Sequence, residues 1–344
     1  MDGEFLKPDH DVSASLSHLL PGTKLQFAWD STSLGLLKTC PRLYELTILE
    51  GYTPRDESVH LRFGGEFHTA LEQYDHSRAN GVRHEDAIHD VVRELLIRTV
   101  DFDPSPDTKA GKYKSRENLI QLVIDYLDHF GEDPAVTFIK EDGTPAVELS
   151  FRFELDWGPG IEVQGKQYMK ELDDPQGIRE FSQPYLLCGH LDRVVHFNDQ
   201  LMVLDRKTTQ TTLTEYFFRQ FEPNNQMTLY ILAGRVVLGT MIKGIIIDGC
   251  QILLESPNRF VRGMTYRTED QIEEWLGDLK VLLAQAESYA QANHWPMNDT
   301  ACDKFGGCQF RGICSKSPQV RERFLRADFE KLEEGKRWNP LIPR

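Results

Sequence analysis

Two runs of alternating apolar and polar residues constrain the fold most strongly, because a dipeptide suited to a tight turn separates them. The runs cover residues 185–197 and 200–207, with Asn198-Asp199 between them. Asn and Asp enter the left-handed backbone of a two-residue hairpin turn more readily than most residues. The pattern therefore predicts a β-hairpin whose paired positions add up to a constant, which sets Asp192 directly opposite Asp205.

These two aspartates form a candidate metal site together with Lys207. Directly opposed residues share a face, with Cβ atoms roughly 5 Å apart, and Lys207 follows Asp205 by two residues, so it lies on that face too. Carboxylates this close repel, and one takes up a proton unless a cation lies between them. A hard divalent ion such as Mg²⁺ or Mn²⁺ suits oxygen ligands. An acidic pair on a solvated strand, with Lys207 as its ion-pair partner, is the alternative.

The rest of the chain indicates helices and strands in mixed order. Helices are expected at 31–46, 64–74, 84–100, 116–130, 214–237 and 268–293, where apolar residues recur at helical spacing. Strands are expected from 146 to 155, where apolar and polar residues alternate, and at 244–254, which is strongly apolar. Residues 101–114 are expected to form a loop. This order predicts an α/β or α+β fold, with α/β preferred, in which helices flank a mixed central β-sheet.

The charge of the chain restricts its partners. A net charge of −15 and a pI near 5.2 argue against a protein that coats nucleic acid without specificity, although a nuclease with a local basic groove remains possible. Two groups of basic residues could line such a groove or be solvated surface: Lys109, Lys112, Lys114 and Arg116, and Arg259, Arg262 and Arg267. The start of the chain lacks a long apolar run, so we expect a cytoplasmic protein without a membrane segment.

The cysteines suggest a second metal site. Three lie close together near one end in a C-x5-C-x5-C run: Cys302, Cys308 and Cys314. In a cytosolic chain such a group favours metal binding over a disulfide. Tetrahedral zinc or an iron–sulfur cube needs a fourth ligand, for which Cys40 is the candidate. A [4Fe–4S] cluster, Zn²⁺ and plain thiols are all compatible with this pattern, whereas Cys188 and Cys250 lie in apolar strands and are expected in the core.

Four short motifs occur in one order along the chain. They are Gly64-Gly65-Glu66-Phe67-His68, Gly189-x-Leu191-Asp192, Asp205-x-Lys207 and Gln226-x-x-x-Tyr230. Together they resemble the RecB-like branch of the PD-(D/E)XK nuclease superfamily, which contains CRISPR-associated and AddB-type exonucleases. The resemblance implies a single nuclease domain, residues 1–344, with a restriction-endonuclease-like core. It also implies a helical iron–sulfur lobe formed by residues 25–60 and 295–320.

Carried over to this sequence, the resemblance gives each motif residue a role. Metal ligands would be His68, Asp192, Asp205 and the backbone carbonyl of Arg206. Lys207 would be the catalytic lysine, and Gln226 and Tyr230, four apart on a helix, would position the scissile phosphate or the strand. His68 could otherwise be an ordinary helix histidine, and the Gln226–Tyr230 pair could simply pack against the sheet. Members of this branch with one distant N-terminal cysteine and three near the C-terminus hold a [4Fe–4S] cluster, which matches Cys40, Cys302, Cys308 and Cys314.

The function implied by the resemblance is a Mg²⁺- or Mn²⁺-dependent DNA exonuclease. It would hydrolyse phosphodiester bonds of single-stranded or frayed DNA ends in end processing, recombination or repair, with a possible helicase or recombination partner. A non-catalytic nucleic-acid-binding or scaffold subunit that keeps the nuclease fold is the second hypothesis. An iron–sulfur or zinc protein without nuclease activity is the third.

Overall fold

The computed structural model of the chain describes residues 17–56, 58–160, 169–171, 179–181, 183–304 and 307–342. The chain divides into two compact units. Unit 1 comprises the described parts of residues 1–56, 150–189 and 269–344, and unit 2 those of residues 57–149 and 190–268. Neither unit is continuous in sequence, and whether the chain is a single nuclease domain stays a prediction.

Unit 2 is built on a mixed sheet, which confirms the predicted fold class. Its path runs through β7 (Leu186–Phe197), β8 (Gln200–Thr209), β9 (Ile242–Gln251) and β10 (Arg259–Tyr266). β8 is antiparallel to β7 and parallel to β9, and β9 is antiparallel to β10. Two further strands, β3 (Val136–Thr137) and β4 (Val147–Glu154), also pair with β7.

The predicted hairpin and its register are confirmed. Asn198 and Asp199 have φ angles of 49° and 58°, and Phe197 pairs with Gln200. The ladder between β7 and β8 then continues only as far as the Arg193–Leu204 pair. Beyond it, β8 stays paired with β9 up to Thr209, so β7 and β8 part immediately before Asp192 and Asp205. We call this place the fork.

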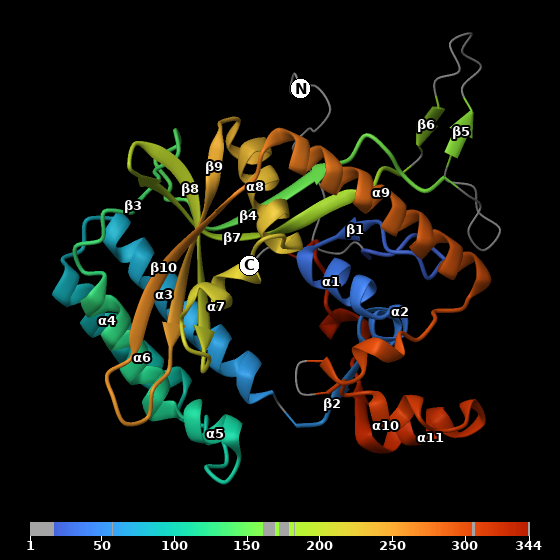
Figure 1. Cartoon of the computed structure of the whole chain (residues 1–344), viewed down its shortest axis with the longest axis horizontal. Coiled ribbons are helices and arrows are strands. Elements are labelled where there is room, and N and C mark those ends of the chain that lie inside the picture. Colours follow the sequence, from blue (N-terminus) through green and yellow to red (C-terminus); the bar gives the residue numbers. More distant parts are fainter. Residues whose placement is uncertain are drawn as a thin grey trace. The chain divides into compact units, whose positions relative to one another are not determined.

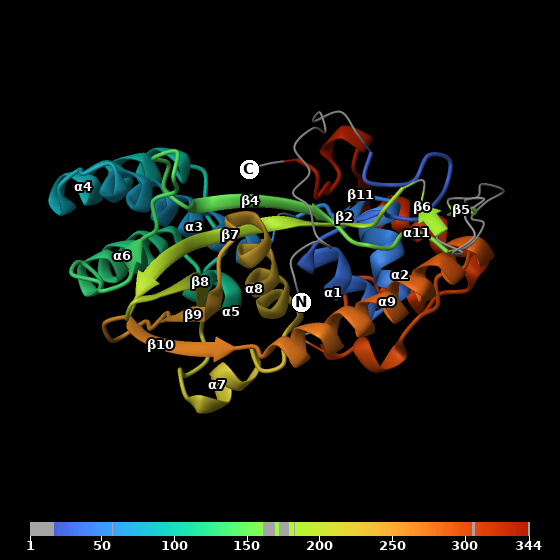
Figure 2. The same cartoon turned by 90° about the horizontal axis from the view of Figure 1, so that it is seen from above.

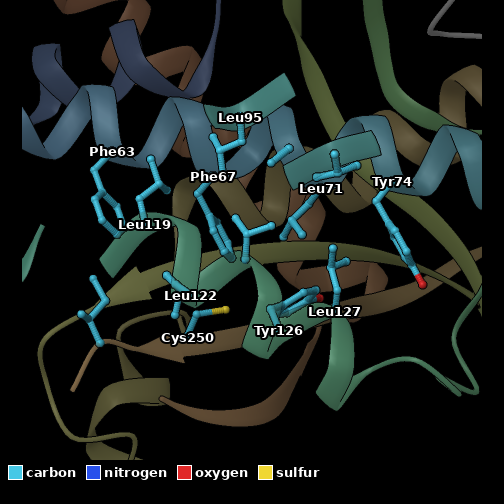
Figure 3. Close-up of a cluster of buried hydrophobic side chains, with 14 of the residues drawn as sticks. Phe63, Phe67, Leu71, Tyr74, Leu95, Leu119, Leu122, Tyr126, Leu127 and Cys250 are labelled. Carbon is cyan, nitrogen blue, oxygen red and sulfur yellow. The ribbon is translucent and has the colours of Figure 1, made fainter. Parts of the chain in front are cut away.

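Helices cover both faces of the unit 2 sheet. α3 (Val59–Ala79), α4 (His84–Arg98) and α6 (Arg116–His129) lie side by side (Figures 1 and 2). Their apolar side chains form a buried cluster that includes Phe63, Phe67 and Leu122 and reaches Cys250 of β9 (Figure 3). α7 (Glu215–Arg219) and α8 (Asn225–Leu238) follow β8 along the chain.

The register assigns the hairpin residues to these faces. Lys207 pairs with Gly249, and a Cβ at Gly249 would lie 2.6 Å from Leu213 and 3.3 Å from Phe217 of α7. Directly paired residues share a face, so α7 covers the face that carries Lys207 and Asp205. Arg206 alternates to the opposite face, where its side chain meets Tyr126 of α6.

Unit 1 is mainly helical. It contains α1 (Ser31–Thr39), α2 (Pro41–Tyr44), α9 (Glu269–Ala292), α10 (Arg311–Cys314) and α11 (Pro318–Asp328). Its short strands are β1 (Ala28–Trp29), which pairs with the start of β7, the pair β2 (Tyr52–Pro54) and β11 (Phe329–Lys331), and the pair β5 (Met169–Glu171) and β6 (Arg179–Phe181). In the part of the chain that the structure describes, no helix is both long and apolar enough to cross a membrane.

Several predicted elements were wrong in detail. The helix expected at 31–46 is interrupted at Cys40, whose backbone is extended because Pro41 follows it. The helix expected at 214–237 is two helices, with Pro223 in the break between them. The stretch 101–114 contains a short helix, α5 (Lys109–Tyr113), and β10 was not predicted at all.

The packing of α7 on the sheet gives a stability prediction. A Cβ at Gly263 of β10 would lie 2.3 Å from the Phe218 ring, so Gly263→Ala should lower the free energy of unfolding by about 1–3 kcal/mol. Gly277→Ala is the control, because Gly277 lies in α9 with no atom within 4 Å of an added Cβ, and it should raise stability by about 0.5–1 kcal/mol. Urea unfolding of both variants measures this, and equal effects would contradict the described packing.

Candidate active site

The fork brings His68 and Asp192 together. His68 projects from α3, and its Nδ1 lies 3.1 Å from Oδ2 of Asp192 in β7. The backbone N–H of Arg206 in β8 points to the same Asp192 oxygen at 3.4 Å. A helix on one face of the sheet thus reaches a carboxylate at the gap between the strands because β7 and β8 have separated there.

Glu148 joins this pair. One ligand atom from each of His68, Glu148 and Asp192 lies within 4.8 Å of the other two, the spacing expected around a single metal ion. Glu148 lies near the start of β4 with a φ angle of 44°, and its side chain is half-buried. Among the described residues, this is the only such group of histidine, cysteine and carboxylate side chains.

Sequence reasoning missed Glu148. Glu148 occupies a polar position in the alternating sequence of β4, where a solvated surface residue is the ordinary interpretation. The pairing of β4 with β7 brings Glu148 near Asp192. The two segments are about forty residues apart, so the sequence around Glu148 does not indicate this contact.

A second group of side chains begins at Asp205, on the sheet face that α7 covers. Lys207 Nζ lies 2.9 Å and 3.0 Å from the two carboxylate oxygens of Asp205, which is fully buried. The same ammonium donates to Oε1 of Gln226 at 3.0 Å, and Gln226 Nε2 donates to the Tyr230 hydroxyl at 2.9 Å. The structure thus brings the predicted residues Asp205, Lys207, Gln226 and Tyr230 into one chain of contacts. Asp205 is paired with lysine here and does not belong to the three-residue group around His68.

Burial and charge set the protonation of these residues. Burial opposes an imidazolium at His68, but the charge and hydrogen bond of Asp192 outweigh it and raise the pKa of His68. Burial likewise opposes ionisation of Asp192, yet the nearby His68 and Lys207 hold its pKa below the ordinary range. Burial raises the pKa of Asp205 despite Lys207, and the adjacent Asp192 charge adds to the increase.

Lys207 keeps its proton in this environment. Burial favours the neutral amine, but the carboxylates of Asp205 and Asp192 reverse the effect and raise the pKa of Lys207 above its usual value. The side chain is therefore an ammonium at neutral pH. It can donate hydrogen bonds and stabilise negative charge, and it is poorly suited to accept a proton.

The side chain of Arg206 is structural. It is almost fully buried, with Nη2 2.6 Å from Oδ2 of Asp75 in α3 and Nε 3.0 Å from the Tyr126 hydroxyl. A metal-binding role for its backbone carbonyl stays a prediction.

Three of the seven residues in the two basic groups are engaged within unit 2. Arg262 pairs with both Asp133 and Asp248, and buried Arg267 donates to Thr228 and to the carbonyl of Phe221. Arg116 binds the Thr99 hydroxyl and the carbonyl of Leu96. These contacts argue against a groove made of the full basic groups. Lys109, Lys112 and Arg259 remain exposed.

The four predicted cluster cysteines gather in unit 1. The backbone N–H of Asn298 points to Cys40 Sγ at 3.3 Å, and the N–H of Cys308 donates to the carbonyl of Cys302 at 2.8 Å. Cys308 and Cys314 pack against a buried apolar cluster: Leu46, Tyr52, Phe310, Ile313, Leu325 and Phe329. Burial raises the pKa of Cys308, and the nearby Cys302 and Cys40 raise it further. Cys188 and Cys250 are buried in the core, as predicted.

The spacing of the thiols bears on the metal they suit. Zn–S bonds of about 2.3 Å in a tetrahedral site place sulfurs about 3.8 Å apart. No three of the cysteine sulfurs lie within 4.8 Å of one another in the described part of the chain. An all-cysteine set suits either a zinc ion or an iron–sulfur cube, and the identity of the metal stays a prediction.

Comparisons with protein families and solved structures gave the following matches. A family model described as the PD-(D/E)XK nuclease superfamily matches residues 29–315. No curated protein matches the chain. A solved structure from Eubacterium rectale, described as a putative exonuclease, has a TM-score of 0.43 and 11% identity over 80% of this chain and 86% of that one. Another, described as SSO0001, has a TM-score of 0.28 and 13% identity over 76% and 79% of the two chains. At these TM-scores neither likeness bears on function.

The group around His68 gives a binding prediction. Glu148→Gln and Asp192→Asn should each weaken Mn²⁺ binding to the DNA-free protein at least about tenfold, or about 1.4 kcal/mol, because each removes a charged ligand. Isothermal titration calorimetry measures the affinity. Glu154→Gln is the control, since Glu154 lies in the same strand but is exposed. Unchanged Mn²⁺ affinity in Glu148→Gln would remove Glu148 from the site.

Proposed function

This chain belongs to the PD-(D/E)XK nuclease superfamily, and we propose that it is a divalent-metal-dependent deoxyribonuclease. The observation that carries the proposal is the fork, where the group of His68, Glu148 and Asp192 lies beside the Asp205–Lys207 pair. Membership of the superfamily supports a nuclease. Metal dependence and DNA as the substrate are inferred from the residues at the fork.

The ligand set fits a divalent cation. Carboxylates suit Mg²⁺ and Mn²⁺, and an imidazole ligand favours Mn²⁺ of the two. His68, Glu148 and Asp192 would hold the ion, with Asp205 and the carbonyl of Arg206 as further candidate ligands. A bound ion of this kind lowers the pKa of water and neutralises charge on a phosphate.

Lys207 has the charge and the position to assist hydrolysis. Its ammonium stays protonated and touches both Asp205 and Gln226. In the proposed reaction it donates a hydrogen bond to the attacking water or to a phosphate oxygen as negative charge develops. Asp205 orients Lys207 by holding its ammonium with two oxygens at 3.0 Å and 2.9 Å.

Gln226 and Tyr230 would orient Lys207 and the strand. Both lie on α8, four residues apart and hydrogen-bonded to each other. The Gln226 carbonyl oxygen fixes the direction of the Lys207 ammonium, and we propose that the Tyr230 hydroxyl or the Gln226 amide contacts the scissile phosphate.

We further propose that the enzyme is an exonuclease acting on single-stranded or frayed DNA ends, in recombination or repair. This finer assignment rests on the resemblance to RecB-like exonucleases. A non-catalytic subunit is the alternative, but such a subunit has no need to keep a buried Asp205 and a fixed Lys207 at the fork.

For unit 1 we propose a [4Fe–4S] cluster held by Cys40, Cys302, Cys308 and Cys314. The all-cysteine set and the apolar packing of Cys308 and Cys314 support it. The ligands come from opposite ends of the sequence, so the cluster would fasten the chain around α1 and α2 to that around α10. Such metal binding contributes directly to folding free energy.

Substitutions at the fork test whether the protein is a nuclease. With end-labelled single-stranded DNA and Mn²⁺, Lys207→Met and Asp192→Asn should each lower kcat at least about a hundredfold. The first removes the positive charge at the reacting phosphate, and the second removes a ligand of the proposed metal. Lys243→Met is the control, since Lys243 is an exposed residue of β9, and it should retain wild-type activity. Cleavage by wild type that matches Lys207→Met would reject the catalytic proposal in favour of a non-catalytic subunit.

The cluster can be tested separately. Protein purified without oxygen should be brown, absorb near about 400 nm and contain about four irons per chain. Cys40→Ser should lose this absorbance and unfold at lower temperature, while Cys188→Ser should keep the colour because Cys188 lies in the apolar core. Colourless wild type with one zinc per chain would instead identify a zinc site.

A further inference from the structure

A buried lysine in unit 2 has no polar partner. Lys114, directly after α5, is only 7% exposed. Its Nζ lies over the Phe63 ring, 5.2 Å from the centroid. Within the described chain, no carboxylate or carbonyl accepts a hydrogen bond from this ammonium. The methylene chain is buried while the ammonium still reaches solvent. Partial burial opposes the charged form and lowers the pKa of Lys114, and the attraction of the aromatic ring offsets this only in part.

The ammonium lies beside the first turns of α3. Phe63 and His60 are three residues apart and therefore share one side of the helix. Burial lowers the pKa of His60, and the positive charge of Lys114 lowers it further. α5 lies beside the start of α3 (Figure 1).

The same place is the positive end of a long helix dipole. α3 has 21 residues and begins at Val59, with the Ser58 side chain accepting from the Leu61 N–H. Partial positive charge at a helix N-terminus attracts anions. The Lys114 ammonium, the exposed His60 imidazole and the N-terminus of α3 thus lie in one region of unit 2, and burial is the only influence that shifts the pKa of Lys114.

We propose that Lys114, His60 and the N-terminus of α3 form a subsite that binds one backbone phosphate of the DNA strand. The proposal rests on the proposed nuclease function. α3 also carries His68, eight residues beyond His60, which is about 12 Å along the helix axis. At a rise of about 3.4 Å or more per nucleotide, the subsite would hold a phosphate roughly two to four nucleotides from the cleaved bond. Exposed Lys109 and Lys112 of α5 would add to the attraction.

Lys114→Met separates binding from folding, because methionine fills the same space without the charge. We expect the variant to melt at a higher temperature than wild type yet bind DNA more weakly. Fluorescence anisotropy with a labelled single-stranded 20-mer in EDTA measures affinity without cleavage. Kd should rise about 5- to 20-fold, and the slope of log Kd against log salt should fall by about 0.7, the loss of one phosphate contact.

Two further variants test whether a change in DNA affinity is specific to the proposed subsite. Lys280→Met is the matched control, since Lys280 also lies over an aromatic ring, that of Trp157 at 5.6 Å, but is exposed on α9. Its Kd and salt slope should stay at wild-type values. His60→Ala changes an exposed residue, so it should fold normally and weaken binding about two- to threefold.

The outcomes distinguish this subsite from the active site and from a free-anion site. Unchanged Kd and salt slope in Lys114→Met would overturn the subsite, even if wild type cleaves DNA. Inorganic phosphate that raises the melting temperature of wild type but not of Lys114→Met, with DNA affinity equal in both, would show a free-phosphate site and also overturn it. Wild type that neither binds nor cleaves DNA would reject the nuclease function itself.

Discussion

The parting of β7 from β8 is the constraint on which the candidate site depends. The two strands pair from the turn up to Arg193 and Leu204, and then each takes other partners. The separation lets a histidine from a helix meet the Asp192 carboxylate beside the backbone of β8. A fully paired hairpin would close this gap.

Successive side chains of β7 and β8 point to opposite faces of the sheet, so the two faces carry different sets of residues. Asp192, Asp205 and Lys207 belong to the candidate site, whereas their neighbours Arg193 and Arg206 extend to the opposite face and pair with Asp75 at 3.4 Å and 2.6 Å. Asp75 is seven residues after His68, two turns along the same side of α3. The ion pairs of Asp75 thus hold α3 on the hairpin, and His68, two turns earlier in the same helix, reaches the candidate site. Removing one member of such a buried pair typically costs about 3–5 kcal/mol, so we regard these ion pairs as what keeps His68 in place.

The relative positions of several candidate-site residues could be predicted from the sequence, because they depend on short-range geometry. The Asn198-Asp199 turn fixes the register of Asp192 and Asp205, and strand alternation adds Lys207. The helical spacing of Gln226 and Tyr230 likewise predicts one face of α8. These inferences need only short-range geometry.

The rest depends on contacts between distant segments. Glu148 reaches the site through the pairing of β4 with β7, and the partners of Arg262 come from segments far apart in sequence. The helix breaks at Pro41 and Pro223 do not depend on distant contacts. The prolines that interrupt those helices are visible in the sequence, so both breaks could have been predicted from it.

The location of a bound metal tests the account most directly. Crystals soaked in Mn²⁺ should give an anomalous scattering peak among the side chains of His68, Glu148 and Asp192, next to Asp205. The same peak should be lost in Asp192→Asn crystals. A Mn²⁺ ion bound elsewhere, with these three side chains left without metal, would contradict the assignment of the fork as the active site.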